Sequence, residues 1–314
     1  MKGLELSRQF YNECGKPMLE QNFAHLLPFI AAGLAGSGSE CYGFDDEISQ
    51  DHDLQPDFCI FLPSEDIVSR KDAFELEKAY AKLPKEFKGH KRNNLSAVGG
   101  NRHGIIRISD FIKEKTGSEN GMLSLYQWLS VPEYSLLEAV NGEIFFDNYG
   151  AISAARERLS YYPEAVRLKK LCGHLLLMGQ SGQYNYSRCI KRGDSAAAQL
   201  AVIEFAKSAM QVLFLQAKRY MPYYKWSFRA LKEISPQYNE LAVMLEFLIS
   251  SGNDSALAKQ KIEIIEEICA KISAENKKQG LLENEKANME EQAYLINMKI
   301  KDNEIRNLHI LYAV

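Results

Sequence analysis

The chain has 314 residues, which is enough for two domains of ordinary size. Hydrophobic residues make up 46% and charged residues 25%, a balance that excludes a disordered or fibrous protein. The formal net charge of −3 argues against binding to nucleic acid or anionic membranes by charge alone, although a local basic patch could still do so.

Targeting signals are absent from the sequence pattern. The N-terminal residues lack a continuous apolar run, and the most apolar helical stretch, around residues 197–218, is interrupted by Glu204 and Lys207. Six scattered cysteines form no Cys-x-x-Cys pair, so we expect reduced thiols that lie mostly in the core. Together these features predict a cytoplasmic protein that does not enter a membrane.

The first half of the chain mixes helix and strand patterns. Helical spacing covers residues 4–27 and, with a break at Pro84, residues 76–88. Two further helices are predicted within residues 123–150, separated by Pro132. Strands are predicted where short apolar runs meet turn residues, at 26–36, at 57–63, at 104–109 and as a pair around Gly142. This order predicts a mixed sheet.

After Gly150 the pattern is almost wholly helical. We therefore predict an α+β protein, with a mixed-sheet domain over residues 1–150 and an all-α helical-bundle domain over residues 151–314. The last part, about residues 255–314, is a charged helical tail. Its polar side favours a solvated face, and the alternative is a face for a protein partner.

An acidic stretch lies between the first two predicted strands, in GSGSECYGFDDEISQDHDLQPDFCIFLP, residues 36–63. Asp51 and Asp53 would share one face of an extended segment, with His52 turned away, because side chains on a strand alternate. Two carboxylates this close raise each other's pKa unless a cation offsets their charge. Proteins hold Mg²⁺ with one or two carboxylates and substrate phosphates, so the pair predicts a magnesium site.

The glycines and serines before these acids suit such phosphates. A Gly-Ser turn that opens a short helix exposes backbone N–H groups to an anion; Gly38 would permit close approach and Ser39 could donate its hydroxyl. The turn, a spacer of residues 40–50 and the Asp-x-Asp pair fall in register before an apolar strand. The combination is more specific than either part and indicates nucleotide binding.

This arrangement resembles the nucleotidyltransferase superfold of DNA polymerase β and the kanamycin nucleotidyltransferases, whose signature is a Gly-Ser turn followed by Asp-x-Asp. The stretch GLAGSGSECYGFDDEISQDHD is similar to the signature of a bacterial family called domain of unknown function 4037. Four later stretches resemble other blocks of that family: WLSVPEYSLLEAVNGEIFFDNYG, RERLSYYPEAV, KRGDSAAAQ and RYMPYYKW. The resemblance spans roughly residues 25–235.

The resemblance implies an N-terminal domain that carries the metal site and a helical domain that closes over nucleotide and acceptor. By matching position, Gly38 and Ser39 would hold the triphosphate of a nucleotide such as ATP. Asp51 and Asp53 would be the catalytic carboxylates that hold Mg²⁺. The implied reaction is in-line attack by an acceptor hydroxyl on the α-phosphorus, with pyrophosphate as the leaving group.

One departure from the superfold bears on catalysis. Active members usually carry a third carboxylate on a later strand, whereas GIIRIS (104–109) offers Arg107 and no acid. Asp57 could substitute because it shares the strand face of Asp51 and Asp53, but Pro56 interrupts that ladder. Nucleotide binding is therefore better supported than catalysis.

Two cations of the helical half are candidate phosphate ligands. Lys225, in RYMPYYKW, could reach a triphosphate oxygen while the neighbouring aromatic side chains flank a base; the alternative is a helix end with Lys225 in solvent. Arg192, in KRGD, could face phosphates, and the simpler interpretation is a turn in which Asp194 caps the next helix.

These observations predict a Mg²⁺-dependent nucleotidyltransferase that moves a nucleoside monophosphate from a nucleoside triphosphate to a hydroxyl of an unidentified acceptor. The weak net charge favours a small molecule over nucleic acid as that acceptor. The alternative is a catalytically inactive protein of the same fold that binds nucleotide as a sensor or scaffold.

Overall fold

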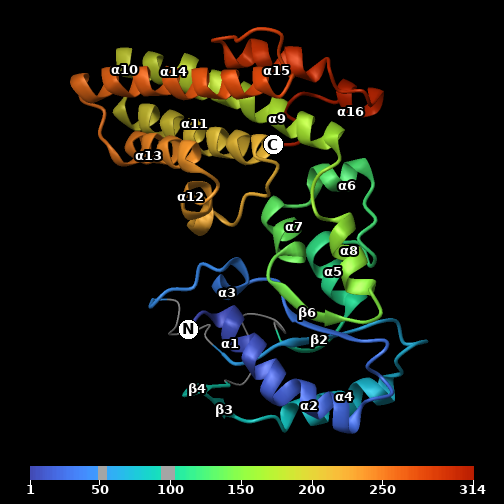
Figure 1. Ribbon diagram of the computed structural model, residues 1–314. Helices are drawn as coiled ribbons and strands as arrows, with labels where there is room; N and C mark the ends of the chain where they lie inside the picture. The colour runs from blue at the N-terminus through green and yellow to red at the C-terminus, as the bar shows by residue number, and fades with distance from the viewer. Residues whose placement is uncertain (49–54, 93–102) are drawn as a thin grey trace. The chain divides into compact units, whose positions relative to one another are not determined.

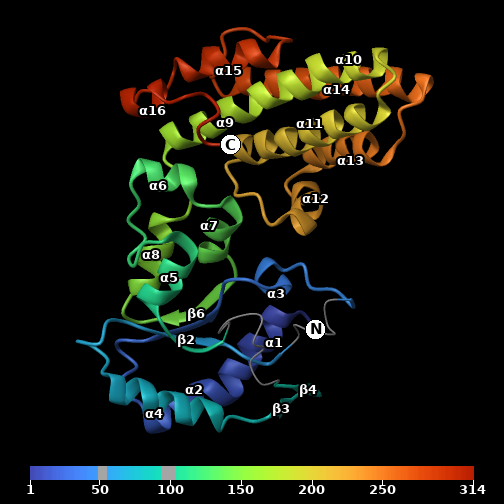
Figure 2. The ribbon, with the colours of Figure 1, turned by 180° about the vertical axis from the view of Figure 1, so that it is seen from behind.

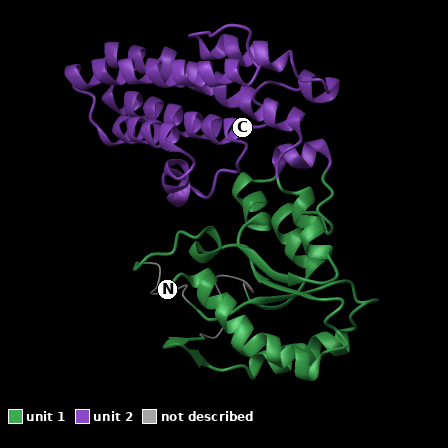
Figure 3. Cartoon of the chain, in the orientation of Figure 1, with its two compact units in different colours: residues 1–123, 131–160 green, residues 124–130, 161–314 purple. Residues whose placement is uncertain are grey.

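A computed structural model describes residues 1–48, 55–92 and 103–314. The chain divides into two compact units (Figure 3): Met1–Leu123 with Val131–Ser160, and Ser124–Ser130 with Tyr161–Val314. Unit 1 contains a small mixed sheet, whereas the regular elements of unit 2 are helices. The chain leaves unit 1 at Ser160 rather than at residue 150, so α8 (Ala151–Arg158) belongs with the sheet.

The sheet of unit 1 has the strand order β5-β2-β1-β6. Its strands are β1 (Ala31–Leu34), β2 (Cys59–Leu62), β5 (Gly104–Arg107) and β6 (Glu143–Asp147). Strand β1 is antiparallel to both β2 and β6, and β2 is parallel to β5, so the sheet is mixed. A short hairpin, β3 (Glu86–Phe87) and β4 (His90–Lys91), lies apart from this sheet in the hydrogen-bond pattern.

Helices cover both faces of the sheet (Figures 1 and 2). One face is covered by α1 (Gly3–Phe10), the π-helical segment η1 (Tyr11–Gly15), α2 (Lys16–Asn22) and α4 (Arg70–Ala81), and the other by α5 (Ile108–Thr116), α7 (Glu133–Val140) and α8. Phe58, Ile60 and Leu62 point into the first core. Phe61 meets Phe111 of α5 with ring centroids 5.3 Å apart. Strand β2 is therefore buried on both faces, which is why it is a continuous apolar run.

The helix predicted after Pro132 is confirmed as α7 (Glu133–Val140), whereas only one of the two strands predicted around Gly142 forms. Only Glu143–Asp147 is a strand, and the residues before Gly142 form helix α7. Pro132 stands immediately before that helix, and the buried Leu136 and Ala139 fall at helical spacing. The apolar run is short, and its period of three to four residues decides for a helix.

Unit 2 is a helical assembly around α11. Its elements are α6 (Leu125–Ser130), α9 (Glu164–Met178), the π-helical segment η3 (Gly179–Tyr186), α10 (Ser187–Lys191), α11 (Ser195–Gln216), α12 (Tyr224–Lys232), α13 (Pro236–Ser250), α14 (Ser255–Lys278), α15 (Met289–Asn297) and α16 (Asn303–Asn307). Asp194 caps α11 by accepting a hydrogen bond from the Ala197 N–H, as predicted. Helix α11 has the length and apolar composition of a membrane span, and 61% of its most apolar stretch is buried inside the structure.

The predicted tail packs into unit 2. Ile265, Ile268 and Ile272 of α14 are buried, and this helix contacts α11 and α13. All six cysteines are free thiols, and four of them are buried, which confirms that prediction.

Candidate functional site

The Gly-Ser turn directly follows strand β1. Gly36 and Gly38 have φ values of +114° and +120°, which an L-residue adopts only with strain. Helix α3 (Ser39–Tyr42) starts immediately after Gly38. Ser39 is only 3% exposed, and its buried Oγ has no hydrogen-bond partner among the described residues. A buried hydroxyl without a partner is costly unless a ligand or water satisfies it.

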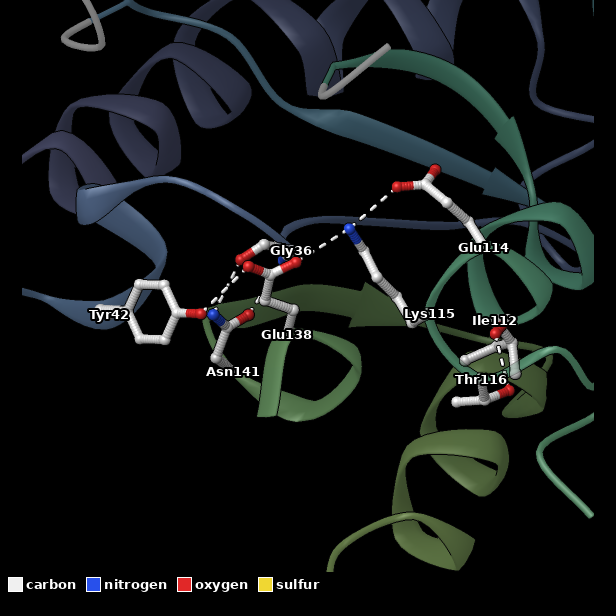
Figure 4. Close-up of polar contacts among 8 residues, drawn as sticks. All are labelled: Gly36, Tyr42, Ile112, Glu114, Lys115, Thr116, Glu138 and Asn141. Atoms are coloured by element: carbon white, nitrogen blue, oxygen red, sulfur yellow. Dashed lines mark hydrogen bonds and ion pairs between the residues drawn. The ribbon is translucent and has the colours of Figure 1, made fainter. Parts of the chain in front are cut away.

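Asn141 fixes this turn from the end of α7 (Figure 4). Its Oδ1 accepts a hydrogen bond from the Gly36 N–H at 2.9 Å, and its Nδ2 donates to the Gly36 carbonyl at 2.8 Å. The next residue, Gly142, donates its N–H to the Cys41 carbonyl at 3.0 Å. The Asn-Gly pair therefore holds both sides of the turn, because Gly36 precedes α3 and Cys41 lies within it.

A second set of contacts fixes α3 (Figure 4). The Tyr42 hydroxyl donates to Glu138 Oε1 at 3.1 Å, and Lys115 Nζ lies 3.0 Å from Glu138 Oε2 and 2.9 Å from Glu114 Oε1. Burial and the Glu138 carboxylate raise the pKa of Tyr42 above its usual range, so its hydroxyl stays a donor. Burial alone lowers the pKa of Lys115, but its hydrogen bonds and attraction to Glu114 and Glu138 raise it overall. Lys115 therefore stays charged.

Sequence reasoning missed these supports. Lys115, Glu138 and Asn141 come from α5, from α7 and from the residue after α7, and Tyr42 lies far before them in the chain. Only the Asn-Gly dipeptide carried a signal, since it marks a turn. The sequence did not indicate that this turn would contact the one at Gly36.

Glu40 lies inside the turn that was predicted to hold phosphate. Its side chain is 4% exposed and folds back so far that a Cβ on Gly38 would collide with its carboxylate. Glycine is thus required at position 38 on two grounds, backbone conformation and space. A phosphate at this turn would have to displace the Glu40 carboxylate.

Asp51, His52 and Asp53 lie outside the described residues, so their roles as catalytic and metal-binding groups stay predictions. The structure does describe what lies on either side. Gly33 of β1 pairs with Cys59 of antiparallel β2, so the Gly-Ser turn after β1 and the residues before β2 meet at one edge of the sheet. Asp53 precedes Cys59 by six residues, a reach of at most about 20 Å.

Asp57 and Arg107, the two residues weighed for the third acid position, both make structural contacts. Asp57 is 5% exposed; the Arg92 guanidinium lies 2.7 Å from its carboxylate, and the Tyr80 hydroxyl donates to it at 2.8 Å. Arg107 donates to the carbonyls of Pro63 and Val68 at 2.6 and 2.8 Å. The Arg92 guanidinium therefore neutralises the charge of the Asp57 carboxylate.

Arg192 and Lys225 lie in separate parts of unit 2. Arg192 precedes α11 and Lys225 follows it, and α11 spans 22 residues, about 33 Å. Figure 1 shows α10 and α12 on opposite sides of α11. Both side chains are exposed, and their roles as phosphate ligands stay predictions.

The cavity of unit 1 contains no predicted site residue. A cavity of about 530 Å³ lies between α2 and α4, lined by Met18, Phe23, Lys78, Lys82 and Leu83 among others. Within the described ranges, no three His, Cys, Asp or Glu side chains are grouped as metal ligands.

Residues 128–227 match the family model described as "Domain of unknown function (DUF4037)". This confirms the resemblance over that segment, which contains Glu138, Asn141, Arg192 and Lys225; the Gly-Ser turn lies outside it.

The crystal structure of a nucleotidyltransferase-like protein from Exiguobacterium sibiricum 255-15 is similar over 87% of this chain and 81% of that one, with 11% identity and a TM-score of 0.37. A similarity this weak carries no conclusion about activity. No curated protein matches the chain.

Proposed function

We propose that this chain is a Mg²⁺-dependent nucleotidyltransferase. An acceptor hydroxyl attacks the α-phosphorus of a nucleoside triphosphate, a new phosphoester bond forms, the bond between the α-phosphorus and its bridging oxygen breaks, and pyrophosphate leaves with that oxygen. A base takes the proton of the hydroxyl. Bound Mg²⁺ would neutralise the phosphate charges, and Asp51 and Asp53 are its proposed ligands.

One observation carries the proposal: the antiparallel pairing of β1 and β2 brings the Gly-Ser turn to the sheet edge where β2 begins. The two proposed acids precede β2 in the sequence, and this closeness along the chain to the sheet edge supports their joint role with the turn. The unpartnered Ser39 hydroxyl supports a ligand at this turn, since a phosphate oxygen would satisfy it.

The turn is also preorganised for this role. Gly36 is held by Asn141 through two hydrogen bonds, and α3 is held by Glu138 through Tyr42. A turn that is fixed before the ligand arrives loses little conformational entropy when the ligand binds. Within the described residues of the turn, the proposal requires displacement of the Glu40 carboxylate.

Thermal stability with Mg²⁺ and each nucleoside triphosphate tests the proposal. A ligand at one hundred times its Kd raises the unfolding free energy by about 2.7 kcal/mol. We expect ATP with Mg²⁺ to raise the Tm, and Asp51→Asn with Asp53→Asn to remove the Mg²⁺-dependent part. Glu47→Gln, at an exposed carboxylate of the same stretch, is the control and should behave as the parent. Unchanged Mg²⁺-nucleotide binding by the double variant would show that the site is elsewhere.

A specific observation also favours the catalytically inactive alternative. Residues 93–109 contain no Asp or Glu, Arg107 contributes to loop packing, and Asp57 is held by Arg92. A third metal ligand is thus missing from the strand next to β2. Pyrophosphate release measured over a set of hydroxyl acceptors separates the two functions: turnover supports the enzyme, and binding without turnover supports the sensor or scaffold.

A further inference from the structure

Exposed and half-buried aromatic rings and cations gather at the start of α12. We define this α12 surface as Tyr223, Tyr224, Lys225, Trp226 and Arg229. The two tyrosines are 43% and 72% exposed, and their ring centroids lie 4.4 Å apart. Lys225 Nζ and Arg229 Cζ lie 5.0 and 5.9 Å from the Trp226 ring. Single exposed aromatic side chains are ordinary, but three adjacent rings with two cations are not.

The segment that contains α12 has an excess of positive charge, although the whole chain has a net charge of −3. Residues 217–235 contain five cations, Lys218, Arg219, Lys225, Arg229 and Lys232, and a single acid, Glu233. This excess of cations is a local basic patch, which the small net charge of the whole chain does not exclude.

Two of these cations form exposed ion pairs with carboxylates. Arg229 pairs with Glu233 at 3.6 Å and Lys232 with Glu246 at 2.5 Å, and all four side chains are more than a third exposed. Exposed pairs of this kind contribute little free energy, so a phosphate can replace the carboxylate. Lys225 makes no ion pair with any described residue, and it lies on the same helix face as Arg229, four residues on.

We propose that the α12 surface binds single-stranded nucleic acid. Bases stack on the tyrosines and Trp226 because every base offers a π face, and phosphates pair with Lys225 and Arg229. A duplex would not suit this surface, since its bases are stacked on each other and expose only their edges. Three rings and five cations along fifteen residues of sequence exceed what one mononucleotide could contact.

This inference changes the role of Lys225 from triphosphate ligand to strand ligand. Strand binding by unit 2 does not depend on the proposed transfer reaction. If the proposed function holds, a hydroxyl of the bound strand is the acceptor, and this identification of the acceptor is the only part of the inference that rests on the proposed function. A nucleic-acid acceptor would replace the small molecule that the net charge favoured.

Fluorescence anisotropy of the full chain tests the inference, with a labelled oligo(U) strand of about 12 nucleotides at roughly 50 mM salt, without Mg²⁺ or nucleotide. We expect binding that weakens as salt rises, because phosphate contacts release counterions. Tyr224→Ala and Lys225→Ala should each raise the Kd at least about five-fold, the effect of losing one stacked base or one phosphate contact.

Two variants elsewhere in unit 2 provide matched controls. Tyr294→Ala removes a tyrosine that is 52% exposed on α15, and Lys259→Ala removes a lysine whose side chain is 82% exposed on α14. Neither should change the Kd. As a second readout, unlabelled oligo(U) should quench the emission of Trp226, because the only other tryptophan, Trp128, is buried.

Three results would overturn the inference: no strand binding at low salt, strand binding that Tyr224→Ala and Lys225→Ala leave unchanged, or competition by a mononucleotide as effective as that by the strand. Equal competition by a mononucleotide would indicate that Lys225 binds the nucleoside triphosphate, and it would not contradict the proposed function. Strand binding without any stabilisation by Mg²⁺ and ATP would support the inference and count against the proposed function.

Discussion

Asn141 holds the Gly36 peptide through both of its side-chain amide groups, accepting from the N–H at 2.9 Å and donating to the carbonyl at 2.8 Å. The contact joins the residue after α7 to the turn after β1, so it sets the position of the proposed phosphate site. Gly36 has φ of +114°, a conformation that needs such external support.

Asn141→Asp tests this contact, because an aspartate keeps the size and the acceptor but loses the donor. We expect a loss of about 1–3 kcal/mol in the unfolding free energy of unit 1, and weaker binding of Mg²⁺ with ATP. Urea denaturation and thermal shift measure the two effects. Asn148→Asp, which loses an exposed hydrogen bond to the Leu27 carbonyl, is the control. Unchanged ATP binding in Asn141→Asp would separate the turn from the nucleotide site.

Gly142→Ala should strongly destabilise unit 1. A Cβ at this residue would collide with the Leu34 carbonyl and lie 2.9 Å from the Ala35 Cα, at a φ of +64°. Backbone strain and overpacking together cost about 2–5 kcal/mol. Gly150→Ala is the matched control, since φ is +78° and no atom lies within 4 Å of the added Cβ. It should cost only about 1–2 kcal/mol in urea denaturation; equal costs would refute the predicted clash.

Glu40→Gln should strengthen nucleotide binding. The substitution keeps the shape of the buried side chain beside Gly38 and removes the negative charge that a phosphate must displace. A unit charge at about 4 Å in water contributes about 1 kcal/mol, so the Kd for Mg²⁺ with ATP should fall about five-fold. Isothermal titration calorimetry measures this change, with Glu47→Gln as the control. A higher Kd in Glu40→Gln would mean that the carboxylate itself serves the ligand.

His174 should make unit 2 sensitive to acid. Burial lowers the pKa of this side chain to about 3, and the charges of Lys170 and Lys207 add to the effect. In the unfolded chain the same histidine binds a proton near pH 6.5. The stability that comes from burying a neutral His174 is therefore fully present above pH 6.5 and is lost as the pH falls towards 3. The loss approaches about 1.4 kcal/mol per pH unit.

Urea denaturation between pH 7 and pH 4 measures how the unfolding free energy changes with pH. For one proton the slope is at most roughly 1.4 kcal/mol per pH unit. His174→Met should flatten the profile of unit 2. His309→Gln, at an exposed histidine, should leave it as in the parent. The same acid sensitivity in His174→Met would assign the effect to other groups.

Much of the element order follows from local pattern. The runs AAGL and CIFL became β1 and β2 because short apolar segments between turn residues bury well in a sheet. Helix α11 begins where Asp194 caps it, as the turn KRGD indicated. The helix after Pro132 also followed from local pattern, whereas the strand pair predicted around Gly142 formed only the single strand β6.

For the candidate site, the sequence by itself determined the Gly-Ser turn, its two glycines and the Asp-x-Asp pair that follows, because local backbone needs and charge repulsion can be read from neighbouring residues. Only the tertiary structure decided that Asn141, Glu138 and Lys115 hold this turn and that Arg92 neutralises Asp57. These contacts join residues far apart in the chain, and no local periodicity encodes which distant side chains will meet once the sheet and its helices have packed.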